Sequence, residues 1–178
     1  MSGLRKWQQT EPVGGHPAVD FVNSVHHWDS DPPPDYFDDF DDFLAWSEEL
    51  GLLDSDARRH FRGRPADEKS DAFQRLLALR RALHDIFASV ARNRPPPGPA
   101  LGDLDEMLRL SIAWRRYRAG KDGIRACWSC ADAPAYAALG PVAWQAADLL
   151  EHGSIDRLKK CPGKHCGWIF IDGSKNRS

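Results

Sequence analysis

Four cysteines, arranged in two close pairs, are the residues in this sequence most able to do chemistry. Two residues separate Cys127 from Cys130, and four separate Cys161 from Cys166. In a reducing cytosol, close cysteine pairs bind metal or do redox work more often than they form disulfides. The second pair encloses a turn that contains proline and glycine, so both thiolates can point at one ion. Since structural zinc is nearly always held by four protein ligands, Cys161 and Cys166 predict half of a zinc site.

The first cysteine pair could supply the other two ligands. The two pairs lie about thirty residues apart, which is a spacing that a four-cysteine zinc site can have. Against this, Cys127 falls in a predicted strand, where a residue three positions away points to the opposite face. We therefore favour Cys127 and Cys130 as small, half-buried apolar residues. Neither interpretation is settled by the sequence, and the strand–CxxC–helix context of a thioredoxin-like site is not present.

A second constellation is polar and lies near the amino terminus. His16, Asp20 and Asn23 follow one another at spacings of four and three, which places them on one face of a helix. With Arg80 as an anion-binding partner, they could form a ligand or metal pocket. The competing interpretation is a buried network of capping hydrogen bonds that ties this segment to the long helix that contains Arg80.

Basic residues surround the second cysteine pair. Such a patch fits contacts with DNA phosphates, which position a protein without specifying a sequence. A second basic group lies around a predicted hairpin at residues 112–128, and we interpret it as a solvated strand face. The predicted nucleic-acid residues are Lys159, Lys160, Lys164, Lys175 and Arg177.

Composition limits the classes of function. The chain of 178 residues carries a net charge of −2, with a pI of about 6.4, so any binding of nucleic acid must be local. Neither a signal peptide nor a membrane span is recognisable, which predicts a cytoplasmic protein. Since no GxSxG, P-loop or dinucleotide motif occurs, the sequence gives no warrant for naming an enzymatic reaction.

The elements that position these residues are mainly helical. Apolar residues recur with a helical period between residues 65 and 92, and shorter helices are expected at 19–25, 38–50, 101–110 and 142–151. Apolar residues alternate on either side of Gly120-Lys121-Asp122-Gly123, which predicts an antiparallel hairpin. Trp168, Ile169 and Phe170 predict the start of a strand. The predicted class is therefore mostly helical α+β, with one small antiparallel hairpin and a C-terminal half zinc knuckle.

Motifs at both ends resemble the CGNR zinc-finger family. The run from Cys161 through Cys166-Gly167-Trp168 to Ser174-Lys175-Asn176 resembles the first half of that family's finger, and residues 14–24, GGHPAVDFVNS, resemble the opening of its N-terminal ABATE domain. The stretches at 79–83 and 141–150 match in the expected order. The Cys-Gly-Asn-Arg signature is absent, and the chain stops just before the family's second cysteine pair would begin. We therefore expect the zinc site of this chain to be incomplete.

The resemblance implies a bacterial transcription regulator. Residues 1–156 would form an ABATE-like sensing domain, and residues 157–178 the truncated finger that contacts DNA. The competing class is a small-molecule-binding protein or an unrecognised enzyme, with its pocket near His16, Asp20, Asn23 and Arg80. The sequence leaves the ligand and a homodimer open, and it gives no reason to expect a membrane partner.

Overall fold

A short buried helix forms the centre of the molecule. The computed structural model describes residues 5–9, 11–120 and 123–174. Helix α1 (Pro17–Val22) buries Ala18, Val19, Phe21 and Val22, which is why its sequence is almost entirely apolar. The longer helices α4 (Ala66–Val90) and α6 (Gly140–His152) both pack against α1. The centre of the fold is therefore a helix covered by other helices.

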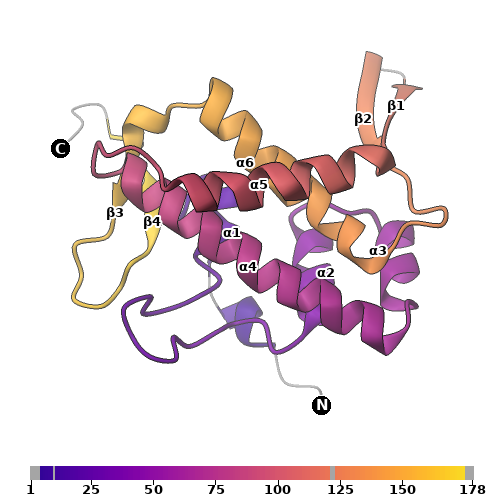
Figure 1. The fold of residues 1–178 in the computed structure, drawn as a ribbon, viewed down its shortest axis with the longest axis horizontal. Helices are drawn as coiled ribbons and strands as arrows, with labels where there is room; N and C mark the ends of the chain where they lie inside the picture. Colours follow the sequence, from indigo (N-terminus) through magenta and orange to yellow (C-terminus); the bar gives the residue numbers. More distant parts are fainter. Residues whose placement is uncertain (1–4, 10, 121–122, 175–178) are drawn as a thin grey trace.

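Helices α4 and α5 (Gly98–Ser111) run side by side along the molecule (Figure 1). Helix α2 (Phe40–Glu49) begins at Asp39, whose carboxylate accepts the Asp42 amide at 2.9 Å, and it contributes Phe40 and Phe43 to the core. Helix α3 (Ser55–Arg62) follows it. Short 3₁₀ turns complete the helical part: η1 (Lys6–Gln9), η2 (Ile112–Trp114), η3 (Ala135–Leu139) and η4 (Ile155–Arg157).

Two antiparallel hairpins lie at opposite ends of the long axis (Figure 1). Strands β1 (Arg115–Gly120) and β2 (Gly123–Trp128) pair so that Arg115 faces Trp128. Strands β3 (Leu158–Lys160) and β4 (Ile169–Ile171) are shorter, yet Leu158 and Ile169 are buried in the same core as the helices. The second hairpin is therefore packed on the helical part through apolar side chains.

The predicted fold class, mostly helical α+β, is confirmed. The expected helices at 38–50, 65–92, 101–110 and 142–151 correspond to α2, α4, α5 and α6. The helix expected at 19–25 begins earlier, at Pro17, because His16 caps its amino end, and it ends at Val22. The first strand of the predicted hairpin begins at Arg115, since Ile112 and Trp114 lie in η2. None of the described helices has the length and apolar character needed to cross a bilayer.

Candidate functional site

Arg80 lies on α4 and is buried, with 2% of its surface exposed. Its guanidinium forms a two-pronged ion pair with Asp35, in which Nη1 lies 3.0 Å from Oδ1, and Nη1 also donates to Ser24 Oγ at 2.8 Å. The ring of Phe37 lies beneath the charge, 5.5 Å from the guanidinium carbon. Burial lowers the pKa of Arg80, and Asp35 opposes that shift. The guanidinium is therefore engaged inside the protein, where it ties the loop before α2 to α4.

His16 and Asp20 make capping contacts at the start of α1. The His16 side chain accepts the Ala18 amide at 3.3 Å, and Asp20 Oδ1 accepts the Gly14 amide at 2.7 Å. Burial lowers the pKa of His16 and raises that of Asp20, and the Gly14 amide opposes the shift at Asp20. Both side chains thus fix the turn that leads into the central helix.

Asn23 joins α1 to a strand that is distant in sequence. Its side-chain amide donates to the Ile169 carbonyl at 2.7 Å and accepts the Ile169 amide at 2.9 Å. Both bonds are buried, and Asn23 is 7% exposed. The Asn23 side chain therefore pairs with β4 as a neighbouring strand would, because it forms hydrogen bonds with both the N–H and the C=O group of Ile169.

The structure only partly brings the four predicted polar residues together. Asp20 and Asn23 line a cavity of about 80 Å³ beside Trp46 and Trp168, whereas His16 and Arg80 are not among its lining residues. This volume is well below the roughly 300–1,000 Å³ of pockets that enclose small organic ligands. Within the described residues, the four side chains make mainly internal hydrogen bonds, and their binding of a ligand stays a prediction.

The second cysteine pair lies in the turn between β3 and β4. We call residues 161–168 the cysteine knuckle. Cys161 donates its amide to the Trp168 carbonyl at 2.7 Å, and Cys166 donates to the Gly163 carbonyl at 3.1 Å, so the turn folds back on itself. The Gly163 amide points at Cys161 Sγ over 3.4 Å. Burial raises the pKa of the Cys166 thiol, and the adjacent Cys161 thiol adds to that shift.

Two neighbouring thiols with an amide directed at sulfur fit one half of a tetrahedral zinc site. Among residues 5–9, 11–120 and 123–174, no three His, Cys, Asp or Glu side chains come together in a way that could hold a metal ion. Cys127 lies in β2 and Cys130 just beyond it, at the opposite end of the molecule from β3 and β4 (Figure 1). The structure therefore does not bring the two cysteine pairs together.

The cysteine knuckle is fastened to the helical part by its backbone and by the Trp168 side chain. The Trp28 amide donates to the Cys166 carbonyl at 3.4 Å, and His84 Nε2 lies 3.2 Å from the Gly167 carbonyl. The Trp168 indole donates to the Val25 carbonyl at 2.7 Å. A Cβ on Gly167 would lie 2.6 Å from Trp28 Cβ, so only glycine permits this approach. The φ of +72° at Gly167 also favours glycine over any other residue.

The predicted DNA-contacting lysines differ in their surroundings. Lys164 in the cysteine knuckle is exposed, whereas Lys159 and Lys160 on β3 are half-buried. Lys160 Nζ lies 3.8 Å from an Asp29 carboxylate oxygen, so part of its charge is balanced within the protein. Lys175 and Arg177 lie outside the described residues.

A comparison with known families decides the relationship of the chain. A family model named ABATE, described as "Putative stress-induced transcription regulator", matches residues 15–153. The chain belongs to the ABATE family. The ABATE match includes α1 to α6 and the β1–β2 hairpin, and it ends before the β3–β4 hairpin. A comparison with curated proteins gives no match.

Sequence reasoning missed the residues that join the ABATE region to the cysteine knuckle. Trp28 stacks on His84 with ring centroids 4.1 Å apart, and together they form the surface on which Cys166 and Gly167 rest. It also missed Asp35, the partner of Arg80. A signal was present for Asp35, because an arginine in the apolar face of a long helix requires an acceptor for its charge.

Proposed function

We propose that this ABATE protein is a transcription regulator in which the cysteine knuckle is half of a CGNR-type zinc finger that contacts DNA. In this proposal the ABATE region senses a small ligand. The family description supports the regulatory role at the coarse level. The observation that carries the finer proposal is the cysteine knuckle itself, where the Cys161 and Cys166 thiols are neighbours. Lys159 and Lys160 directly precede Cys161 in the chain, and Lys164 lies between the two cysteines. Contact with bacterial DNA would place the protein in the cytoplasm.

Zinc would be held by Cys161 and Cys166 together with two ligands that the described residues do not supply. A bound zinc ion would keep both thiols deprotonated and would fix the turn that contains Lys164. The backbone contacts of Cys166 and Gly167 with Trp28 and His84 give the proposal its physical link between sensing and DNA contact. A change in the packing of α4 would move these contacts and, with them, the finger.

The DNA proposal predicts that lysine charge near the cysteine knuckle determines affinity. We expect Lys159→Gln and Lys164→Gln together to lower the slope of log affinity against log salt by about 1.8, since each lost phosphate contact removes about 0.9. The measurement is fluorescence anisotropy of a labelled 30-bp duplex at several salt concentrations with zinc present. It is made on this chain and on the chain extended through the second cysteine pair of the CGNR finger.

The control for this experiment is Arg59→Gln. Arg59 is exposed on α3, where its guanidinium pairs with the exposed Asp56 carboxylate. Its replacement therefore removes one positive charge from the surface of α3. We expect this variant to leave the salt slope unchanged. Equal effects of the lysine and arginine variants would mean that the cysteine knuckle is not the DNA contact.

A further inference from the structure

The cavity beside Asp20 and Asn23 has acidic walls. It lies where the amino-terminal segment 7–13, α1, the end of α2 and the cysteine knuckle meet. None of the described residues that line it is a lysine, an arginine or a histidine, whereas three of them carry carboxylates: Glu11, Asp20 and Glu49. The charge of these walls therefore favours a positively charged occupant.

The three carboxylates have no counter-ion in the described part of the chain, where none of them forms an ion pair. Glu11 and Glu49 are exposed, but Asp20 is half-buried, and its Oδ1 accepts the Gly14 amide at 2.7 Å. Burial raises the pKa of the Asp20 carboxyl, which means that its charged form loses hydration. A cation in the cavity would compensate for that loss.

The Arg80 guanidinium reaches one wall of the cavity, because it donates to Ser24 Oγ at 2.8 Å and Ser24 is a lining residue. Its charge is balanced by the ion pair with Asp35. It therefore opposes the binding of a cation much less than an unpaired guanidinium would.

Aromatic side chains form most of the remaining wall. Three indoles and one phenol ring line the cavity: Trp7, Tyr36, Trp46 and Trp168. Aromatic walls of this kind hold quaternary ammonium groups in other proteins. A metal ion fits less well, since the three carboxylates do not come together as metal ligands among the residues that the structure describes. The walls thus suit a positive nitrogen surrounded by methyl groups.

The size of the cavity agrees with a small head group. A single water occupies roughly 10–15 Å³ of such a space, so about 80 Å³ has room for about five non-hydrogen atoms. A trimethylammonium group and the carbon that carries it have this size. Glu11 and Val13 are exposed at the rim, so the rest of a ligand can extend into solvent.

We propose that this cavity binds the head group of a small quaternary ammonium compound, with its charge beside Asp20 and its methyl groups against Trp46 and Trp168. The inference rests on the proposed regulatory function for its role as the sensing site. Trp168 is the last residue of the cysteine knuckle and donates to the Val25 carbonyl, so a bound head group would contact the knuckle directly. Binding itself requires no DNA.

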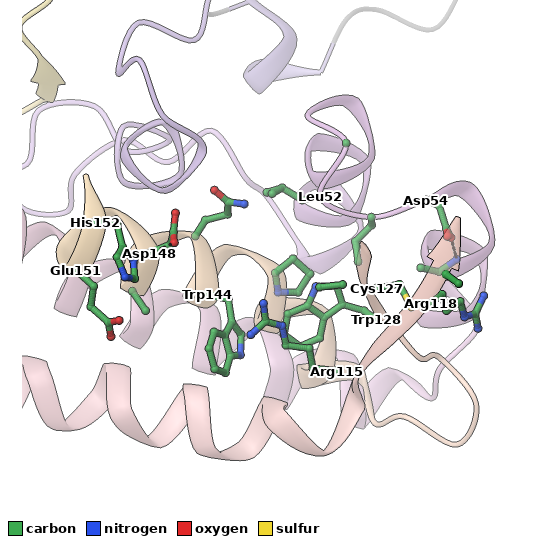
Figure 2. A pocket seen from close by; sticks show the side chains of 18 residues that line it. Leu52, Asp54, Arg115, Arg118, Cys127, Trp128, Trp144, Asp148, Glu151 and His152 are labelled. Atoms are coloured by element: carbon green, nitrogen blue, oxygen red, sulfur yellow. Dashed lines mark hydrogen bonds and ion pairs between the residues drawn. The ribbon is translucent and has the colours of Figure 1, made fainter. Parts of the chain in front are cut away.

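The larger groove between the β1–β2 hairpin and α6, about 850 Å³, has no such preference for one charge (Figure 2). Arg118 lines it on the hairpin, and Asp148 and Glu151 line it on α6. The Arg115 guanidinium carbon lies 4.2 Å from the Trp144 ring centroid, so one face of that indole is already covered. Since the groove shares no lining residue with the cavity, Trp144 can report binding outside the cavity.

The test is a titration of the native protein with choline and with 3,3-dimethyl-1-butanol, in which carbon replaces the charged nitrogen. Two-dimensional NMR follows the indole N–H signals of Trp46 and Trp168 in the cavity and of Trp144 in the groove. We expect choline to shift the two cavity signals but not that of Trp144. Choline should bind about tenfold or more tightly than the alcohol, because the alcohol has no charge to interact with the carboxylates and rings.

Asp20→Asn should weaken choline binding about tenfold, and its amide oxygen can still accept the Gly14 amide. Glu49→Gln should weaken it about two- to threefold, since an exposed carboxylate is screened by water and salt. Glu48→Gln is the matched control, because Glu48 is the preceding residue of α2 but pairs with Arg58 and does not line the cavity. It should leave choline binding unchanged.

Four results would overturn the proposal: equal affinity for choline and the alcohol, no shift of the cavity signals at millimolar choline, shifts confined to Trp144, or equal losses in Glu48→Gln and Glu49→Gln. The titration contains no DNA. Its failure would therefore leave the DNA-binding proposal standing, and a failure of salt-dependent DNA binding would leave the cation site standing.

Discussion

Replacing Asp35 by alanine is expected to lower the free energy of unfolding by about 3–5 kcal/mol, because it leaves the charge of the buried Arg80 without its counter-ion. The change would leave the Arg80 guanidinium in the core, with Ser24 Oγ as its remaining described hydrogen-bond acceptor. The aromatic ring of Phe37 cannot replace a carboxylate. Urea unfolding followed by circular dichroism measures this loss.

The opposite replacement provides the comparison. Arg80→Met removes the charge from the core and leaves Asp35, whose side chain is 29% exposed, in partial contact with water. We expect Arg80→Met to cost less than Asp35→Ala, and the double variant to cost less than the sum of the two. Wild-type stability in Asp35→Ala would contradict the structural role of Arg80 and would return this residue to the list of ligand-binding candidates.

Asn23→Ala is the second variant with a large expected effect. It would remove both hydrogen bonds to Ile169 and leave a buried amide and a buried carbonyl without their partner, at a cost of about 2–4 kcal/mol. Because these bonds join α1 to β4, the loss should be greatest at the β3–β4 hairpin. In Asn23→Ala, the rate of hydrogen exchange at the Ile169 amide should rise above its wild-type value by more than the rates at amides in the middle of α5.

Asn23→Asp serves as the control for that variant. The aspartate keeps an acceptor for the Ile169 amide but loses the donor to the Ile169 carbonyl, so we expect it to protect the amide better than alanine does. If Asn23→Ala had native stability and native exchange at Ile169, Asn23 would not be holding the strand.

Helices with enough buried residues were predictable from the sequence. Phe73, Leu76 and Leu83 follow the helical period through α4, and Gly51, with a φ of +69°, ends the region of α2 as expected. Helix α3 was not predicted, because only Ala57 and Phe61 mark its buried face among charged neighbours. Strand β3 has three residues, two of them lysines, and depends on pairing with β4.

The polar residues around α1 could be picked out from the sequence, but their contacts could not. The polar side chains of Asp20, Asn23 and Arg80 stood out in apolar surroundings, and the network interpretation anticipated that they would be hydrogen-bonded. Their partners did not stand out, since Asn23 and Ile169 are 146 positions apart in the sequence and Arg80 and Asp35 are 45 positions apart. Such pairings depend on how the helices pack, and helical periodicity contains no information about distant partners.

The proposed regulatory function is tested most directly by measuring the affinity of the zinc-supplied protein for a 30-bp duplex at several salt concentrations. Contacts from Lys159, Lys160 and Lys164 predict an affinity that falls with salt at a slope of about −2 to −3 on a double-logarithmic plot. The slope should depend on Lys159, Lys160 and Lys164 and not on Arg59. Binding that is absent or indifferent to salt, in this chain and in the chain extended through the second cysteine pair of the CGNR finger, would contradict the DNA-binding function.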